Sequence, residues 1–498
     1  MTISPFKLSA LEIAKKCKET PSFIDEMMHF YIERNRALQP LLNSHTGWDE
    51  NIIEQQVDIL KSSDYKQKPL AFVPVVVKDN ICTKEFATTC ASRMLKNYHS
   101  PYDATVVELL KKAGAIIFGK ANLDEFAMGS SNETSAFGTV KNPWNLEKVP
   151  GGSSGGSAAV VAGDLAPLSV GSDTGGSIRQ PASFCGIFGI KPSYSTVSRY
   201  GLVAYASSLD QIGPFARSAK DLAAILDVLI NHDERDSSSK IHPQKSKTFL
   251  SGLTSKDLKG KTIGIVQEFS GGGLNKEVSS CFEDALTQLK ALGAQVKSIS
   301  LPAIKYAIST YYIIASAEAS ANLARFDGVR YGHRAQKNSN KSDAHSNSLV
   351  DMYRKSRTEG FGDEVKRRIF LGTYVLSAGY RDAYYEKATR LRQMIRDDFS
   401  KAFSQVDLLI SPTCPTTAFK IGEKISDPLE MYLNDIYTIA VNLAGLPALS
   451  MPIGYDAQGL PIGAQLIGPM FAEAHLLDVA HVYEKETTWL NQRQPQFL

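Results

Sequence analysis

Two glycine–serine blocks lie close together in the first half of this chain, and they limit what it can fold into. The first is GGSSGGS at residues 151–157, and the second is GSDTGGS at residues 171–177. A glycine–serine run on its own is typical of a flexible linker. Here an apolar stretch of small residues at 158–163 separates the blocks, and the apolar run FCGIFGI follows at 184–190. Because a linker does not continue into a core, the sequence predicts that both blocks are ordered loops of a folded unit.

The second block offers a hydroxyl beside consecutive backbone N–H groups. The residues in question are Thr174, Gly175, Gly176 and Ser177. Glycine places almost no steric limit on φ and ψ, so the N–H groups can turn toward one point. A nucleophilic serine needs such donors around the oxygen that becomes negative when a carbonyl is attacked. The block therefore predicts a site in which Ser177 is the nucleophile and the three residues before it contribute to the oxyanion hole.

A serine nucleophile needs a base within hydrogen-bond reach, and the local candidate is a lysine. No histidine lies between His99 and His232, the stretch that holds both blocks. Lys78 ends the apolar, β-branched run at 71–77 and precedes a turn signal, which places it at the end of a buried strand. A neutral lysine requires its pKa to fall by roughly 3 units from about 10.4, which burial can produce. On its own, such a lysine is more simply explained as capping the strand and reaching water. The two serine blocks nearby favour the interpretation of Lys78 as a general base.

These motifs together resemble a known family. The block at 151–157, the run DTGGSIRQP at 173–181 and the sequence GIKP at 189–192 are similar to the motif of the amidase signature family. The segment KDN at 78–80 is similar to the catalytic lysine segment of that family. The resemblance implies an α/β fold, the amidase signature fold, in which a large mixed β-sheet is covered by helices on both faces.

The same resemblance assigns roles to three residues. It implies that Ser177 forms the acyl-enzyme, that Lys78 is the general base, and that Ser153 bridges the two from a cis peptide bond. A proton then passes from Ser177 to Ser153 and on to Lys78 during attack, and the relay runs backwards to protonate the departing amine. The products of this step are ammonia and an acyl-enzyme, from which water then releases the acyl group.

Segments outside these motifs resemble, more narrowly, the A subunits of the tRNA-dependent amidotransferases. They lie at 121–130, 318–328, 357–362 and 431–447, so the resemblance covers nearly the whole chain. It implies a glutaminase that supplies ammonia to a partner subunit, where ATP and Mg drive the conversion of glutamyl-tRNA(Gln) to glutaminyl-tRNA(Gln). It also implies two further subunits, one that binds tRNA and ATP and a small stabilising one. No Walker phosphate loop is present, and neither a cofactor nor a metal is expected on this chain.

Free glutamine carries a carboxylate and an ammonium group, so its site needs a cation and an anion. Arg357 is the predicted carboxylate ligand, because a planar guanidinium can hold a carboxylate bidentately. The same arginine lies in a charged segment and is equally consistent with a solvated surface residue. The other predicted substrate contacts are Met128, Ser130, Tyr312 and Asp427.

No linker rich in proline, glycine or charge divides the 498 residues, so we expect a single amidase domain over 1–498. Within it we expect an N-terminal helical segment at about 1–65, the signature core at about 70–215, and exposed loops at about 232–247 and 333–348. A net charge of +3 gives no strong basic field, so contact with tRNA is expected mainly through the partner. The lack of an apolar leader or an unbroken apolar span predicts a cytoplasmic protein.

Apolar periodicity predicts helices and strands in alternation. Helical spacing is found at 8–18, 105–112, 220–230, 277–292 and 376–403. Short β-rich runs are found at 72–77, 116–119, 262–266, 296–299 and 406–410. Such alternation predicts a sheet covered by helices, in agreement with the fold that the resemblance implies.

Three other interpretations remain open. A stand-alone amidase shares the serine–lysine chemistry and differs in its pocket and its lack of partners. An α/β-hydrolase esterase fits the G-x-S-x-G pattern at 151–155, but its nucleophile elbow needs a strand directly before it, and 142–150 is turn-like. A catalytically silent scaffold only organises its partners, which the intact Lys78, Ser153 and Ser177 argue against.

Overall fold

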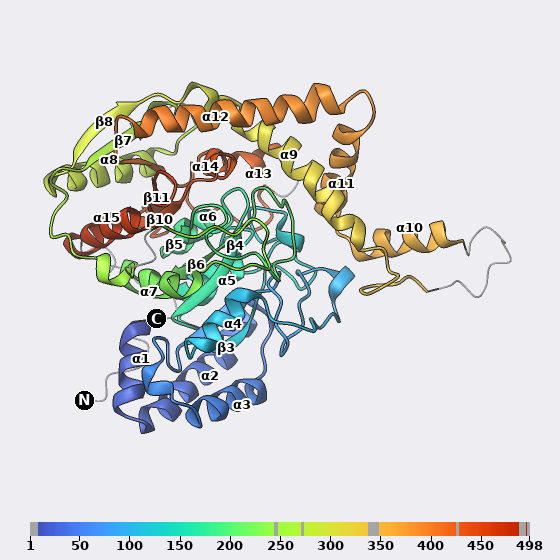
Figure 1. Cartoon of the computed structure of the whole chain (residues 1–498), viewed down its shortest axis with the longest axis horizontal. Helices are drawn as coiled ribbons and strands as arrows, with labels where there is room; N and C mark the ends of the chain where they lie inside the picture. Colours follow the sequence, from blue (N-terminus) through green and yellow to red (C-terminus); the bar gives the residue numbers. More distant parts are fainter. Residues whose placement is uncertain are drawn as a thin grey trace.

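A mixed β-sheet of eleven strands runs through the chain (Figure 1). The computed structural model describes residues 8–243, 248–269, 273–336, 348–424, 428–487 and 495. The strands are β1 His45–Gly47, β2 Pro74–Lys78, β3 Ile116–Ala121, β4 Leu168–Asp173, β5 Phe188–Lys191, β6 Gln211–Ala216, β7 Thr262–Val266, β8 Gln295–Ile299, β9 Leu408–Pro412, β10 Ala448–Tyr455 and β11 Pro461–Ile467. Their order in the sheet is β1-β3-β2-β4-β6-β5-β10-β11-β9-β7-β8. Two parallel blocks, β3-β2-β4 and β9-β7-β8, are joined through antiparallel strands.

Fifteen α-helices are found in the described ranges. They are α1 Ala10–Glu19, α2 Ser22–Leu42, α3 Glu50–Lys61, α4 Thr105–Lys112, α5 Gly155–Ala162, α6 Arg179–Cys185, α7 Ala219–Leu229, α8 Lys276–Ala291, α9 Ala307–Asn322, α10 Leu349–Gly360, α11 Asp363–Leu376, α12 Lys387–Phe403, α13 Pro428–Leu433, α14 Ile439–Ala444 and α15 Glu473–Glu486. The first three lie together at the bottom of Figure 1, and α10 projects from the body of the molecule. None of the helices described combines the length and the apolar character that a membrane crossing requires.

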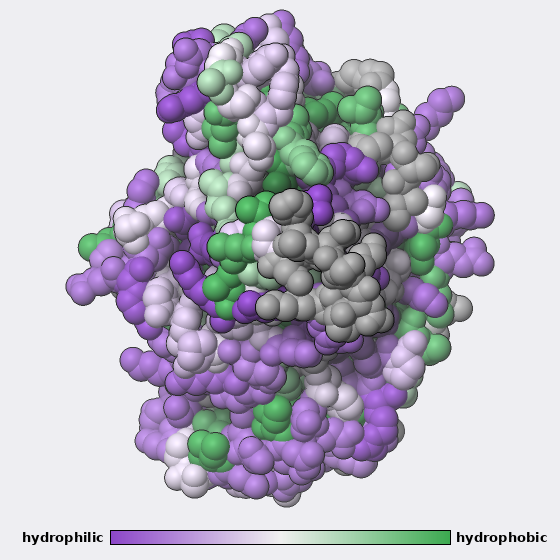
Figure 2. Space-filling view, turned by 90° about the vertical axis from the view of Figure 1, so that its right-hand side faces the viewer, coloured by the Kyte–Doolittle hydropathy of each residue, from purple (hydrophilic) through white to green (hydrophobic). Residues whose placement is uncertain are grey.

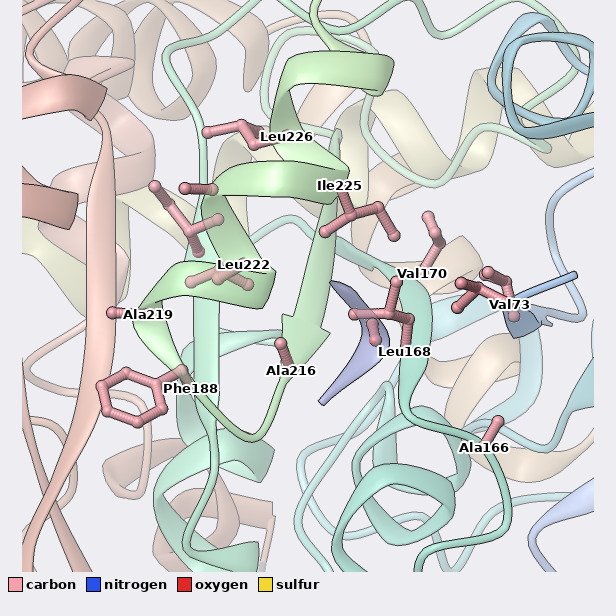
Figure 3. Close-up of a cluster of buried hydrophobic side chains, with 14 of the residues drawn as sticks. Val73, Ala166, Leu168, Val170, Phe188, Ala216, Ala219, Leu222, Ile225 and Leu226 are labelled. Carbon is pink, nitrogen blue, oxygen red and sulfur yellow. The ribbon is translucent and has the colours of Figure 1, made fainter. Parts of the chain in front are cut away.

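Helices cover both faces of the sheet, as the alternation of side chains along β4 shows. Leu168 and Val170 lie in one apolar cluster with Ile225 of α7 (Figure 3). Ser169, between them, donates a hydrogen bond of 2.7 Å to the carbonyl of Ser157 in α5. Because successive side chains of a strand point to opposite faces, α7 and α5 lie on opposite faces. The predicted α/β fold, with a mixed sheet covered on both sides, is confirmed.

The helix predicted at 376–403 begins five residues later in the structure, at residue 381. α11 ends at Leu376, and the chain turns at Gly379, whose φ of +83° lies in the left-handed region that favours glycine. The π-helical turn η10, Asp382–Glu386, then leads into α12. The apolar spacing continues across the turn at 377–380, so periodicity alone placed the start of the helix too early.

The loop predicted at 232–247 is described as far as residue 243; most of its described residues are exposed, and a few buried side chains anchor it. Asp233 is buried and accepts hydrogen bonds from the hydroxyls of Thr105 and Ser198. Residues 244–247, and 337–347 of the second predicted loop, lie outside the described residues. The single-domain organisation stays a prediction.

α11 approaches α9 closely at a glycine. A Cβ atom on Gly372 would lie 1.9 Å from the carbonyl oxygen of Ser316 in α9, so any side chain there would push the helices apart. Val365, Arg368 and Val375 of α11 are buried with Gly372. The close packing fixes the position of these side chains relative to the core.

Candidate active site

Lys78 is the last residue of β2, and its side chain is completely buried. Its Nζ atom lies 2.8 Å from Ser153 Oγ, 2.8 Å from Ser154 Oγ and 3.0 Å from Ser172 Oγ. Burial lowers the pKa of Lys78 to about 7, although the nearby carboxylate of Asp124 acts to raise it. A substantial share of the side chain is therefore neutral near pH 7, as a general base requires.

The neighbours of Lys78 orient its electron pair. A neutral amine has two N–H donors and one lone pair. Ser154 Oγ donates to the carbonyl of Ser172 at 3.0 Å, and Asn80 Nδ2 donates to Ser172 Oγ at 3.0 Å. The hydroxyl oxygen of Ser154 is thus left to accept one N–H of the amine, and the hydroxyl and carbonyl oxygens of Ser172, at 3.0 and 3.3 Å from Nζ, are acceptors for the other. The lone pair of the neutral amine then faces Ser153 Oγ, the direction from which a proton arrives.

Ser153 follows a cis peptide bond after Gly152, as the family resemblance implies. The backbone here lies against Asp124, because a Cβ on Gly152 would be only 2.1 Å from Asp124 Oδ2. The N–H of Asp124 donates to the carbonyl of Ser153 at 3.2 Å, and its carboxylate accepts from the N–H of Asn132 at 2.9 Å. Glycine is therefore required at position 152, and these contacts hold Ser153 beside Lys78.

The segment before Ser153 excludes an esterase elbow. Residues 143–150 consist of turns and isolated bridges, and α5 begins at Gly155. A nucleophile elbow needs a strand that runs directly into the turn. The esterase interpretation is therefore wrong.

The loop after β4 brings backbone N–H groups to the same site. β4 ends at Asp173, whose buried carboxylate accepts from the N–H of Gly176 at 2.8 Å. Within the described chain, the N–H groups of Thr174, Gly175 and Ser177 have no acceptor. These three are therefore available to an oxyanion, whereas the N–H of Gly176 holds the loop to Asp173. The predicted part of Gly176 in the oxyanion hole stays a prediction.

Glycine is required at two positions of this loop. Gly176 has a φ of +144°, and a Cβ there would lie 2.3 Å from Thr438 Oγ1. A Cβ on Gly175 would lie 2.7 Å from the ring of Tyr311. Thr438 Oγ1 also donates to the carbonyl of Gly175 at 2.6 Å. The loop thus packs against α9 and the chain before α14, which fixes its conformation.

Ser177 lies at the end of this loop, directly before α6. Its carbonyl accepts from the N–H of Ser154 at 3.2 Å, and this bond brings the two glycine–serine blocks together. Ser177 is 8% exposed, whereas Lys78 and Ser153 are completely buried. The structure thus gathers the three residues that the sequence singled out, and Ser177 is the one that solvent reaches.

The loop rests on a buried ion pair. Arg179 Nε lies 3.1 Å from Asp173 Oδ2, and both side chains are completely inaccessible to solvent. Burial raises the pKa of Asp173, but the charge and hydrogen bonds of Arg179 outweigh it and hold the pKa at about 2. Asp173 in turn holds the N–H of Gly176, so the pair supports the candidate oxyanion loop.

We expect Arg179→Met to lower the free energy of unfolding by about 3–5 kcal/mol, because it leaves a buried carboxylate without its partner. The pKa of Asp173 lies below its unfolded value of about 3.9, so the stabilisation is present above about pH 4 and is lost as the pH falls toward 2. Urea unfolding between pH 2 and 7 measures both effects. Arg354→Met is the matched control: Arg354, which lies 2.9 Å from Asp351, is 73% exposed, so the loss should stay below about 1 kcal/mol. Equal losses in both variants would contradict the prediction.

A second group of buried polar side chains lies against the same loop. A Cβ on Gly176 would be 3.3 Å from Asp435 Oδ1. Ser130 Oγ donates to Asp435 Oδ2, whereas Asp435 Oδ1 has no hydrogen-bond partner in the part of the chain described. Burial raises the pKa of Asp435 to about 7, and Ser130 and Arg368 act against it. A buried carboxylate oxygen without a partner is suited to accept a hydrogen bond from a cationic ligand.

Arg368 supplies a positive charge near Asp435. It lies on the buried side of α11, 4% exposed, with its guanidinium carbon 5.2 and 5.6 Å from the ring centroids of Tyr312 and Tyr432. These two rings stack on one another at 3.8 Å. The Nε of Arg368 donates to Glu364 Oε1 at 2.8 Å. Because a guanidinium has five N–H donors, Arg368 can also hold a carboxylate.

Ser130 and Tyr312, two of the predicted substrate contacts, lie in this second group, but Arg357 does not. The guanidinium of Arg357 donates to the carbonyls of Leu323 and Phe326, at 2.8 and 3.1 Å. It links α10 to the turn that follows α9 and does not lie with the second group. Of the other two predicted contacts, Met128 is buried two residues before Ser130, and Asp427 lies outside the described residues.

The sequence analysis missed Arg368 and Asp435. A signal for Arg368 was present, because it falls with Val365, Gly372 and Val375 on the buried face of α11, where a charged residue needs a specific partner. Asp435 carried no signal. It lies in a polar turn before α14, where an aspartate is ordinarily explained by turn formation.

A cavity of about 560 Å³ lies apart from both groups. Its lining comes from residues 92–94, 96–99, 136–137, 331–333 and Glu359, none of which belongs to the two groups. In the described ranges no three or more His, Cys, Asp or Glu side chains are arranged to hold a metal ion.

Comparison with known proteins agrees with this geometry. Residues 26–477 match the amidase family. The chain is 54% identical over 470 residues to the A subunit of glutamyl-tRNA(Gln) amidotransferase from Microcystis aeruginosa, covering 94% of this chain and 95% of that one. It is 52% identical over 478 residues to the corresponding protein of Coxiella burnetii, covering 95% and 96%.

Comparison with solved structures points to the same family. The crystal structure of the A subunit of glutamyl-tRNA(Gln) amidotransferase from Thermotoga maritima superposes with a TM-score of 0.80 at 42% identity, covering 98% of this chain and 96% of that one. A 6-aminohexanoate cyclic dimer hydrolase superposes with a TM-score of 0.83 at 25% identity over the whole of both chains. The chain therefore belongs to the amidase family and, within it, to the glutamyl-tRNA(Gln) amidotransferase A subunits.

Proposed function

We propose that this chain hydrolyses glutamine and passes the ammonia to a partner subunit, which uses ATP and Mg to convert glutamyl-tRNA(Gln) to glutaminyl-tRNA(Gln). The observation that carries the chemistry is the buried Lys78, with Nζ 2.8 Å from Ser153 Oγ and a pKa of about 7. The identity of about half of all residues to amidotransferase A subunits over nearly the full length supports the substrate and the partner.

In this proposal acylation begins at Ser177. Its Oγ attacks the amide carbon of glutamine while its proton passes to Ser153 Oγ and the proton of Ser153 passes to the Lys78 lone pair. The oxyanion that forms accepts hydrogen bonds from free N–H groups of the loop, each worth roughly 2.7–4 kcal/mol in the transition state. The proton then returns through Ser153 to the leaving nitrogen, so ammonia departs and a glutamyl ester remains on Ser177. Water attacks the ester by the same relay and releases glutamate.

The second group of buried residues suits the two charged ends of glutamine. Arg368 would bind the α-carboxylate, and Asp435 Oδ1 would accept from the α-ammonium. Ser130 holds the other oxygen of Asp435, which leaves Oδ1 for the ligand. Asp435 lies beside Gly176, one residue before the nucleophile. A substrate held by both charges therefore has its side-chain amide directed toward the Ser177 loop.

The test is ammonia release by this chain, alone and co-expressed with its candidate partner subunits. We expect glutamine to be used, and far better than an uncharged amide of similar length such as butyramide, because only glutamine presents both charges. Efficient hydrolysis of butyramide by the isolated chain, with no gain from the partners, would instead establish the stand-alone amidase. No ammonia release under any of these conditions would favour the silent scaffold.

We expect Arg368→Met to raise KM for glutamine by roughly tenfold to a hundredfold with a smaller change in kcat, because a charge-assisted hydrogen bond contributes about 1.5–3 kcal/mol. Hydrolysis of butyramide should be unaffected, since that substrate has no carboxylate. Arg367→Met is the matched control, because Arg367 is the adjacent arginine and is half exposed. A similar rise in KM for both variants, or an equal loss with butyramide, would speak against the binding role.

A further inference from the structure

Arg368 is removed from nearly all of its water, and other groups must replace that water. Charged side chains ordinarily stay in solvent, and hydrophilic side chains predominate in the lower half of the face shown in Figure 2. Arg368, by contrast, is only 4% exposed. Each N–H of a buried guanidinium needs an acceptor, either from the chain or from a ligand. The acceptors around Arg368 therefore decide which of its N–H groups are left for a substrate.

Tyr205 supplies one of these acceptors. It is 1% exposed, in the segment before β6, and its hydroxyl accepts a hydrogen bond from Nη1 of Arg368. The guanidinium carbon lies 5.5 Å from the centroid of the Tyr205 ring. Glu364 accepts from Nε. Among the described residues no acceptor is found for Nη2, so two of the three nitrogens are fixed and the third is left for a ligand.

The backbone of Tyr205 is held on both sides. Its N–H donates to Asp210 Oδ2 at 2.9 Å, and its carbonyl accepts from Asn322 Nδ2 of α9 at 3.2 Å. α9 also carries Tyr312, whose ring lies against the guanidinium of Arg368. The orientation of Arg368 is thus preorganised, which lowers the cost of ordering it when a carboxylate binds.

The segment that carries Tyr205 also reaches the candidate oxyanion loop. Asp210 is buried, and its Oδ1 accepts from Thr174 Oγ1 at 2.7 Å. Thr174 is the first residue of that loop after β4, and its N–H is one of the three available to an oxyanion. Residues 205–210 therefore connect the carboxylate-binding arginine to the loop that ends in the nucleophile.

We propose that Tyr205 is a positioning residue for glutamine: its hydroxyl holds Nη1 of Arg368 so that Nη2 meets the α-carboxylate of the substrate. The inference rests on the proposed function, because it concerns the binding of the same substrate. Without the hydroxyl, the guanidinium is held at one nitrogen instead of two. An amide that has no carboxylate makes no use of this arrangement. Tyr205 thus contributes to the preference for glutamine over uncharged amides.

The test is Tyr205→Phe in the full chain, co-expressed with the partner subunits, because this change removes one oxygen atom and keeps the ring. We expect KM for glutamine to rise roughly fivefold to twentyfold, with kcat within about threefold of wild type. The ratio of kcat/KM for glutamine to kcat/KM for butyramide should fall about fivefold or more. A purely structural role would lower the use of both amides alike and leave this ratio unchanged. Tyr483→Phe is the matched control, because Tyr483 on α15 is 2% exposed and belongs to neither group, so the ratio should stay at the wild-type value.

A double variant shows whether Tyr205 acts through Arg368. Once Arg368→Met has removed the guanidinium, the hydroxyl of Tyr205 has nothing to hold, so adding Tyr205→Phe should change KM by less than about twofold. Full multiplication of the two single effects would overturn the proposal. An unchanged KM or an unchanged ratio in Tyr205→Phe alone would overturn it as well.

Glutamine binding to the Ser177→Ala variant, measured by titration calorimetry, separates this inference from the proposed function. Tyr205→Phe in that background should weaken the binding of glutamine about fivefold or more. Ammonia release by a Tyr205→Phe variant with the wild-type KM refutes the positioning role alone. Weakened binding in the Ser177→Ala background, together with no ammonia release by the wild-type complex, refutes the glutaminase alone. If glutamine does not bind the Ser177→Ala variant at all, both proposals fail.

Discussion

Replacement of Ser177 by alanine is expected to abolish glutamine-dependent formation of glutaminyl-tRNA(Gln) in the assembled complex, while amidation with added ammonium chloride continues at the wild-type rate. Ser177 supplies the oxygen that forms the acyl-enzyme, so ammonia release should fall by about 10⁴-fold or more, as for the loss of other serine nucleophiles. Ammonium chloride bypasses that half-reaction, because the partner subunit then receives ammonia from solution. The measurement is tRNA amidation with each nitrogen donor at equal complex concentration.

The matched control for Ser177 comes from the first glycine–serine block. Ser157 is also a buried serine, and its Oγ donates to the carbonyl of Val170 at 3.3 Å, away from the lysine. Ser157→Ala should therefore keep glutamine use within a few-fold of wild type. If Ser177→Ala lost amidation with both donors, the synthetase chemistry would not be separate from this chain, and the proposed division of labour would fail.

Local signals predict Lys78 as the base and Ser177 as the nucleophile, and the family resemblance adds Ser153 between them. Each lies in a short segment whose composition is unusual for its surroundings: a lysine at the end of an apolar strand, and serines within glycine runs. The strand that positions Lys78 was predicted from the apolar run at 72–77, whereas β4, which leads into the Ser177 loop, was not predicted. The family resemblance added the pairing between the two blocks, which no local pattern contains.

The substrate contacts depend on tertiary packing, which sequence reasoning reached only in part: Ser130 and Tyr312 lie in the second group, whereas Arg357 does not. Arg357 and Arg368 lie eleven residues apart in equally charged segments, and each has the donors that a carboxylate needs. What separates them is the helix on which each lies. Gly372 lets α11 approach α9, which buries Arg368 beside Tyr312, whereas α10 projects outward and Arg357 is used on backbone carbonyls.

The strands missed at 168–173, 188–191 and 211–216 have a similar cause. They are short, each contains a glycine, and all are completely buried. Apolar periodicity reports a contrast between a buried and an exposed face, and such strands have none. They are nevertheless the centre of the sheet, because β4 carries the loop that ends in the nucleophile.

Replacement of Lys78 by methionine is expected to lower kcat for glutamine by about 10²–10⁴-fold, the contribution of a positioned general base. Methionine fills a similar volume but has no lone pair to take the proton of Ser153. Lys191→Met is the matched control. Lys191 is also completely buried, and burial, followed by the charge of Arg179, lowers its pKa to about 7. Its Nζ, however, donates to the carbonyl of Pro192 at 2.9 Å. Its loss should leave kcat within about tenfold. Equal losses would mean that removing any buried lysine impairs the enzyme.

The pH dependence of the wild-type enzyme distinguishes the base from the binding carboxylate. Lys78 must be neutral to accept a proton, so the acylation rate should rise tenfold per pH unit below about 7 and level off above it. Asp435 must be ionised to bind the ammonium of glutamine, and its pKa in the free enzyme is also about 7, so kcat/KM should rise more steeply, approaching a hundredfold per unit at low pH. Bound glutamine brings a positive charge to Asp435 and lowers its pKa, so the rise of kcat with pH should depend on the ionisation of Lys78 alone. The measurement is ammonia release between pH 5 and 9. In Asp435→Asn, the rise of kcat/KM with pH should become as shallow as that of kcat. If the pH profile of Lys78→Met still rose below pH 7 as in the wild type, the rise would belong to a group other than Lys78.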